Sequence, residues 1–100
     1  MKVPDIPHAN VPAAKDVEGA IRSSSLGVYE VEVIDESHLH AGHAGSTGGR
    51  HYRVRIVATA FEGKPLVARH RMVNALFDAS LKSGAIHALA LTTVAPSENR

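Results

Sequence analysis

Histidine is the residue type in this sequence with the clearest capacity for chemistry. Seven histidines occur in 100 residues, and His38, His40 and His43 fall together in one glycine-rich stretch. Imidazole nitrogens bind iron, zinc, copper and nickel, so this spacing is compatible with a transition-metal site. The same three residues would also suit an ordinary solvated loop, and spacing alone leaves both interpretations open.

Two further histidines, His51 and His87, each lie near the start of a segment with the alternation of a strand. His87 shares its side of the alternation with Leu89 and Leu91, so it is either a metal ligand or a partly buried structural residue. We expect His51 to be structural, or to support a ligand rather than to act as one.

The absence of cysteine limits the chemistry further. It excludes disulfides, a thiol nucleophile and any metal site built from thiolates of this chain. The carboxylates show no spacing of an acid–base pair, and neither a nucleophile elbow nor a phosphate-binding loop is recognisable. We therefore expect a protein that is not an enzyme.

Basic residues gather around the start of the segment 65–82, which has helical periodicity. They could bind a nucleic acid or a protein partner, because anions are bound favourably at helix N-termini. An ordinary solvated helix face is the simpler interpretation. The residues concerned are Lys64, Arg69, His70 and Arg71.

The composition is typical of one small globular domain, with 44% apolar residues, 21% charged residues and a formal net charge of +1. A charge so close to zero argues against nucleic acid as the main partner. The N-terminal residues do not resemble a signal peptide, and no apolar run is long enough to cross a bilayer. We therefore expect a cytoplasmic protein that does not associate with membranes.

Residue patterns predict a helix, two strands, a second helix and a third strand, over residues 13–24, 28–35, 51–59, 65–82 and 85–94. A helical crossover between two strands of one sheet makes those strands parallel. The expected fold is therefore α/β (α+β), a three-stranded mixed sheet covered by helices on one face. We expect residues 1–12 to form a flexible arm, 13–95 the domain and 96–100 a frayed tail.

The first two predicted strands are expected to pair as a hairpin. A register with Glu32 opposite Arg53 would also place Glu30 opposite Arg55, giving two cross-strand ion pairs. The connection over residues 36–50 is much longer than an ordinary hairpin loop, which is typical of functional or disordered segments. The side chains predicted to face the core are those of Tyr52, Val54, Ile56 and Ala58.

An ordered series of motifs resembles the BolA-like family. The longest is F-E-G-K-x-L-V-x-R-H-R over residues 61–71, followed by H-A-L over residues 87–89. Residues 51–54 and the G-H-A motif at 42–44 also match, and the resemblance extends over about residues 15–97. It implies a fold like a class II KH domain, in agreement with the predicted order of elements.

This resemblance implies a monothiol glutaredoxin as partner and a [2Fe–2S] cluster shared between the two proteins, with glutathione supplied on the partner's side. His87, in the H-A-L motif, matches the family's strand ligand. The family's loop ligand, which is cysteine in some members and histidine in others, matches His43, with His38 and His40 as alternatives. The chain would then be of the histidine-loop type and would act in iron–sulfur trafficking or sensing.

Other functions stay open at this point. A KH-like fold with basic residues at a helix start could serve a DNA-binding regulator, although the GXXG loop with which KH domains clamp nucleic acid is missing. A metal-free adaptor could bind another protein through the second helix and the last strand. The isolated chain could also form a homodimer.

Overall fold

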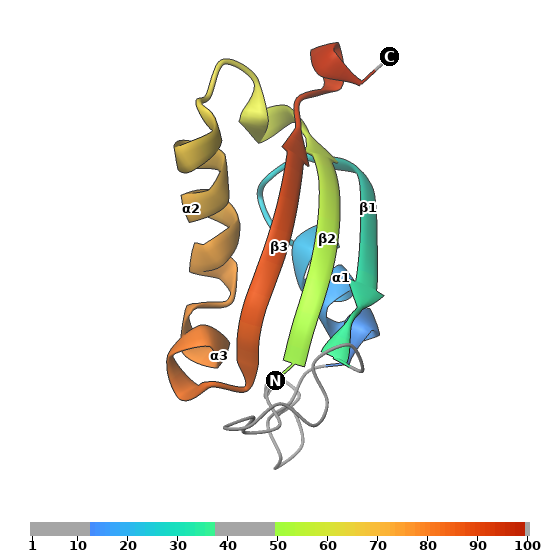
Figure 1. Cartoon of the computed structure of the whole chain (residues 1–100). Coiled ribbons are helices and arrows are strands. Elements are labelled where there is room, and N and C mark those ends of the chain that lie inside the picture. The colour runs from blue at the N-terminus through green and yellow to red at the C-terminus, as the bar shows by residue number, and fades with distance from the viewer. Residues whose placement is uncertain (1–12, 38–49, 100) are drawn as a thin grey trace, which may run out of the picture.

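The computed structural model describes residues 13–37 and 50–99, and their elements follow the predicted order (Figure 1). Strand β2 is central in the sheet, antiparallel to β1 and parallel to β3. This confirms the α+β fold with a three-stranded mixed sheet. The elements are α1 (Ala14–Arg22), β1 (Val28–Asp35), β2 (Arg50–Ala58), the 3₁₀ turn η2 (Thr59–Phe61), α2 (Leu66–Leu76), α3 (Asp78–Ser83), β3 (Ile86–Val94) and the 3₁₀ turn η3 (Pro96–Glu98).

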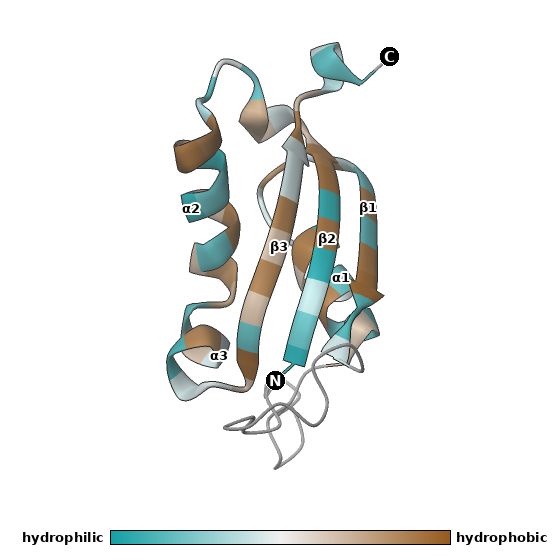
Figure 2. Ribbon diagram, in the orientation of Figure 1, coloured by the Kyte–Doolittle hydropathy of each residue, from teal (hydrophilic) through white to brown (hydrophobic). Residues whose placement is uncertain are grey.

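Alternation along β2 builds the core, as predicted. Apolar and polar residues alternate along this strand (Figure 2), and the four residues predicted to face inward are all buried. Val17 and Ile21 of α1 belong to the same buried cluster, together with Val73 of α2. Helices α1 and α2 therefore cover the same face of the sheet, as expected from the sequence.

The pairing register of β1 and β2 differs from the prediction by two residues, because Arg55 rather than Arg53 lies opposite Glu32. A shift of two keeps every side chain on its predicted face, since side chains alternate with a period of two. The ion pairs form diagonally instead, Arg55 with Glu30 at 3.0 Å and Arg53 with Glu36 at 2.8 Å. Long side chains reach diagonal partners, so charge complementarity alone did not determine the register.

The helix predicted over residues 65–82 is two helices in the structure. Helix α2 ends at Leu76 and α3 begins at Asp78, because the backbone of Phe77 leaves the helical conformation, with φ −118° and ψ 23°. The Phe77 side chain packs into the core cluster. Gly84 ends α3 with a φ of 86°, a left-handed conformation that favours glycine.

The buried side of α2 is formed by residues four positions apart. Arg69 and Val73 face inward, and Phe77 continues this side beyond the helix end, whereas Leu66 is 61% exposed and His70 is half-buried. Residues four apart share one face of a helix, so Arg69 is part of the packed side. Among the described residues, no helix has both the length and the apolar character needed to cross a membrane.

Residues 96–99 are held against the sheet and are not frayed as predicted. Asn99 accepts a hydrogen bond of 2.8 Å from Arg55 and donates one of 3.2 Å to Glu30, so the turn reaches strands β2 and β1. The 3₁₀ turn η3 and Asn99 are therefore packed against the strands. The predicted arm at residues 1–12 lies outside the described residues.

Candidate metal centre at one end of the sheet

The strand directions bring three strand ends together at one end of the sheet. Strand β1 ends where β2 begins, and β3 begins beside β2, with Asp35 opposite Tyr52 and Arg50 opposite Ile86. His51 is the second residue of β2 and His87 the second of β3. The two histidines are therefore neighbours in space, although 36 positions separate them in the sequence.

An irregularity in the pairing of β2 and β3 directs His87 toward His51. Arg50 lies opposite Ile86, but His51 lies opposite Ala88, so two residues of β3 face one residue of β2. Such a bulge re-aims side chains and is common beside functional sites. The His51 and His87 rings lie edge to face, with centroids 4.7 Å apart and planes at 66°.

This bulge corrects one expectation drawn from the sequence. His87 was expected to share a face with Leu89, but Leu89 packs against the core while His87 is exposed. His51 was expected to be structural or to support a ligand, and its ring contacts that of His87. A local pattern cannot show a bulge, because the extra residue becomes visible only when two strands pair.

Hydrogen bonds on both sides fix the backbone of His51. Its N–H donates to the Ser37 hydroxyl at 3.1 Å, and its carbonyl oxygen accepts from the Glu36 N–H at 2.8 Å. The Ser37 N–H in turn donates to an Asp35 carboxylate oxygen at 2.8 Å. The half-buried His51 is thereby positioned by the chain that leaves β1.

Charges close to the histidines are paired with one another. Arg50 contacts Asp35 at 3.0 Å, and Arg53 contacts Glu36 at 2.8 Å. The hydrogen bond that Arg53 donates to the Glu36 carboxylate raises the pKa of Arg53. Burial raises the pKa of the Tyr52 phenol, with the negative charge of Asp35 as the next cause. Carboxylates and guanidiniums therefore neutralise each other around the imidazoles.

The donor set of this end of the sheet suits a metal that accepts nitrogen ligands. His87 is one of the predicted ligands, whereas His38, His40 and His43 lie outside the described residues. Within residues 13–37 and 50–99, no three or more histidine or carboxylate side chains gather as a metal-binding group. Two imidazoles fit iron, copper, nickel or zinc as partial ligands, with the remaining positions left to other molecules.

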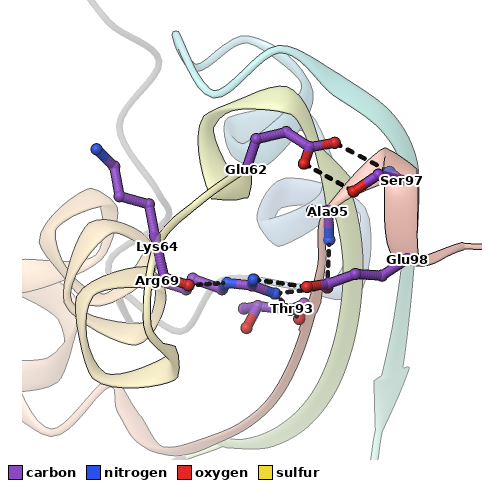
Figure 3. A network of polar contacts seen from close by, with 7 residues as sticks. All are labelled: Glu62, Lys64, Arg69, Thr93, Ala95, Ser97 and Glu98. Atoms are coloured by element: carbon purple, nitrogen blue, oxygen red, sulfur yellow. Dashed lines mark hydrogen bonds and ion pairs between the residues drawn. The ribbon is translucent and has the colours of Figure 1, made fainter.

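Arg69 does not form part of an exposed basic surface, which corrects the grouping predicted for the start of α2. It is 6% exposed, and its guanidinium donates to the Lys64 and Thr93 carbonyl oxygens and to both carboxylate oxygens of Glu98 (Figure 3). Lys64 and Arg71 are exposed, and His70 is half-buried. The sequence alone could not show that Arg69 meets Glu98 across the fold.

The family model described as BolA-like protein matches residues 23–98 of the chain. The chain belongs to the BolA-like family. The match includes every strand and the second and third helices. It also includes both histidines of the ring contact, His51 and His87.

Curated relatives support this assignment over most of the BolA-like chain. SufE-like protein 1, chloroplastic/mitochondrial, of Arabidopsis thaliana is 47% identical over 79 residues, covering 73% of this chain and 21% of that protein. Protein BOLA1, chloroplastic, of the same plant is 43% identical, covering 74% of this chain and 48% of that protein. The chain thus spans less than half the length of these two relatives. Their names include organelles, and the cytoplasmic location of this chain stays a prediction.

Solved structures of BolA-like proteins share the fold. The BolA domain of SufE1 from Arabidopsis thaliana superposes with a TM-score of 0.73 at 39% identity, covering 85% of this chain and 93% of that one. BolA1 from the same plant gives a TM-score of 0.73 at 36% identity, covering 89% and 97%. The three-stranded sheet with its helices is therefore the family's fold.

Proposed function

We propose that this BolA-like protein is a non-catalytic adaptor that traffics or senses iron–sulfur clusters in a heterodimer with a monothiol glutaredoxin. The observation that supports it most is the exposed His87 at the sheet end, turned by a bulge to the side of His51. A chain without cysteine cannot contribute a thiolate to such a cluster, and imidazole is the other ligand that [2Fe–2S] clusters accept.

Ligand arithmetic determines what a partner would have to supply. A [2Fe–2S] cluster takes four protein-type ligands, usually thiolates. In this proposal His87 and the loop histidine His43, with His38 and His40 as alternatives, donate imidazole nitrogens. A glutaredoxin cysteine and glutathione donate the sulfur ligands. Neither protein then holds the cluster alone, which suits transfer or sensing rather than catalysis on a substrate.

Imidazole ligands would make cluster binding by this chain depend on the reduction potential and on pH. Two imidazoles on one iron raise the reduction potential relative to all-thiolate ligation. The ligating imidazole must also be neutral, so binding weakens as the pH falls. His87 is exposed and can reach a partner without any rearrangement of the sheet. A cluster held in this way is cargo that can be released.

Co-expression with a monothiol glutaredoxin tests the proposal, with visible absorption and circular dichroism recorded on the purified pair. The His87→Ala variant should bind the cluster at least about 10-fold more weakly, because loss of a group that merely supports a metal ligand already costs about that much affinity. Ser25→Ala is the control, since this exposed residue lies in the turn before β1, at the opposite end of the sheet from His87. A wild-type spectrum from His87→Ala, or no cluster in the unsubstituted pair, contradicts the proposal.

DNA binding is the other function considered, and the geometry gives it less support than the sequence did. Arg69 is engaged within the fold, which leaves Lys64 and Arg71 as exposed cations of the predicted grouping. A mobility-shift assay with DNA at physiological salt, on the unsubstituted protein and on the Lys64→Ala plus Arg71→Ala variant, tests the DNA-binding hypothesis. Sequence-selective binding that these substitutions abolish would favour the DNA-binding function over the adaptor.

A further inference from the structure

We propose that His51 and His87 together chelate one divalent transition-metal ion in the isolated chain, before any partner is bound. This site differs from the shared cluster in its metal, in its second ligand and in needing no glutaredoxin. It is made from two residues of the described fold, one on the central strand and one on an edge strand.

The separation of the rings matches what one ion requires. Metal–nitrogen bonds of about 2 Å in a tetrahedral arrangement place the centres of two imidazole ligands about 5 Å apart. The centroids of His51 and His87 are 4.7 Å apart. Because His87 is exposed, its ring can turn about its side-chain bonds to direct a nitrogen at the ion. The distance therefore needs no movement of the backbone.

The backbone holds the two ligands in this arrangement before a metal arrives. Two hydrogen bonds fix the backbone of His51. Its N–H donates to the Ser37 hydroxyl, and its carbonyl oxygen accepts from the Glu36 N–H. His87 is set by the bulge, in which it and Ala88 lie against His51 alone. Ligands positioned by strands are more precise than ligands on loops, so little entropy would be lost on chelation.

Local charge does not oppose a dication at this position. The guanidinium of Arg50 is paired with Asp35 and that of Arg53 with Glu36, so each nearby positive charge is balanced. Two nitrogen donors without a thiolate suit Cu²⁺, Ni²⁺ or Zn²⁺, with water completing the coordination. Cu²⁺ is expected to bind most tightly, since it ranks highest for nitrogen sites.

Occupation of this site would have a consequence for the partnership, in a step that rests on the proposed function. His87 cannot ligate an ion and the shared cluster at the same time. A bound divalent ion would therefore compete with cluster assembly, and the isolated chain would respond to the supply of such ions.

Titration with Cu²⁺, followed by pulsed EPR, tests the site in the chain without glutaredoxin. The background carries His8→Ala, His38→Ala, His40→Ala and His43→Ala, which leaves three histidines. One equivalent of Cu²⁺ should bind with two imidazole nitrogens. His51→Ala in this background should leave one imidazole and bind about 10-fold more weakly or worse, judged from the cost of disturbing a metal site.

His70→Ala and His87→Ala complete the series. His70→Ala should leave the affinity and the two nitrogens unchanged, whereas His87→Ala should behave like His51→Ala. Amide NMR spectra check that each variant is folded. A single imidazole in the background, unchanged affinity in His51→Ala, or an equal loss in His70→Ala overturns the proposal. Because no glutaredoxin is present, none of these outcomes bears on the shared cluster.

Discussion

Arg69 and Glu98 form an ion pair that joins the start of α2 to the C-terminal turn, with the guanidinium buried and the carboxylate half exposed. The Arg69 guanidinium is almost fully enclosed. It donates four hydrogen bonds, two of them to the Glu98 carboxylate. The hydrogen bond from Arg69 is the largest cause that lowers the pKa of Glu98 from 4.5 to about 2, followed by that from the Ala95 N–H. A buried guanidinium is tolerated only with such partners.

Acid should therefore destabilise the protein through Glu98. A carboxyl with a depressed pKa in the folded state stabilises fully above its unfolded pKa of 4.5, and this stabilisation is lost as the pH falls toward about 2. Glu98→Gln should be less stable than the unsubstituted protein at pH 7 and should lose less stability between pH 5 and about 2. Thermal unfolding across this pH range measures both effects.

Ser97→Ala is the matched control for this prediction. Ser97 lies in the same turn as Glu98, and its hydroxyl donates a hydrogen bond of 2.8 Å to Glu62. The substitution removes this hydroxyl but leaves the Glu98 carboxylate in place. It should therefore keep the pH slope of the unsubstituted protein. An equally steep acid slope in Glu98→Gln would show that other carboxylates govern the acid unfolding.

At the level of elements, the sequence predicted what depends on local pattern and missed what depends on pairing. Strand β1 has the predicted bounds, because alternation and its flanking residues are local signals. The bulge at His87 and the register of β1 with β2 depend on how strands meet. The family resemblance favoured His87 as a ligand, whereas the contact between its ring and that of His51 becomes visible only when the strands are paired.

The junction between α2 and α3 was also beyond local pattern. Apolar periodicity continues through Phe77, so the residue looks like part of one helix, yet its backbone leaves the helix while its side chain enters the core. Val73 and Phe77 keep the spacing of one face, and Leu81 of α3 also packs on the core. Core packing therefore overrides helix continuity at this residue.

Phe77→Ala should consequently cost about 3–5 kcal/mol of unfolding free energy, as expected for a buried aromatic side chain. Leu76→Ala, one position away and 39% exposed, is the control and should cost less than about 1 kcal/mol. Urea denaturation followed by circular dichroism measures both. Similar costs for the two variants would show that Phe77 does not link the helices through the core.

On the scale of the whole molecule, the sheet has two differently used ends. The helices cover one face, and the C-terminal turn follows β3 at one end of the sheet (Figure 1). Val57 alternates with core residues of β2 yet is fully buried, and it lies opposite Glu30, to which Asn99 donates a hydrogen bond. The turn thus closes one end of the sheet, while the two histidines lie at the opposite end.

Removal of residues 96–100 should therefore destabilise the entire domain, although the sequence predicted this segment to be frayed. The deletion takes away Glu98 and leaves the buried guanidinium of Arg69 without its carboxylate. A buried charge left without its partner is strongly destabilising. We expect the Tm to fall by on the order of 10 °C, given the temperature shifts that a small domain shows.

A second background identifies the cause of that loss. Arg69→Met replaces the buried cation with an apolar side chain of similar length. Removal of the tail then leaves no buried charge without a partner at this position. The same deletion should then lower the Tm by less than half as much, as measured by differential scanning calorimetry on the four proteins. Equal losses in both backgrounds would mean that the tail stabilises the sheet through the hydrogen bonds of Asn99, independently of Arg69.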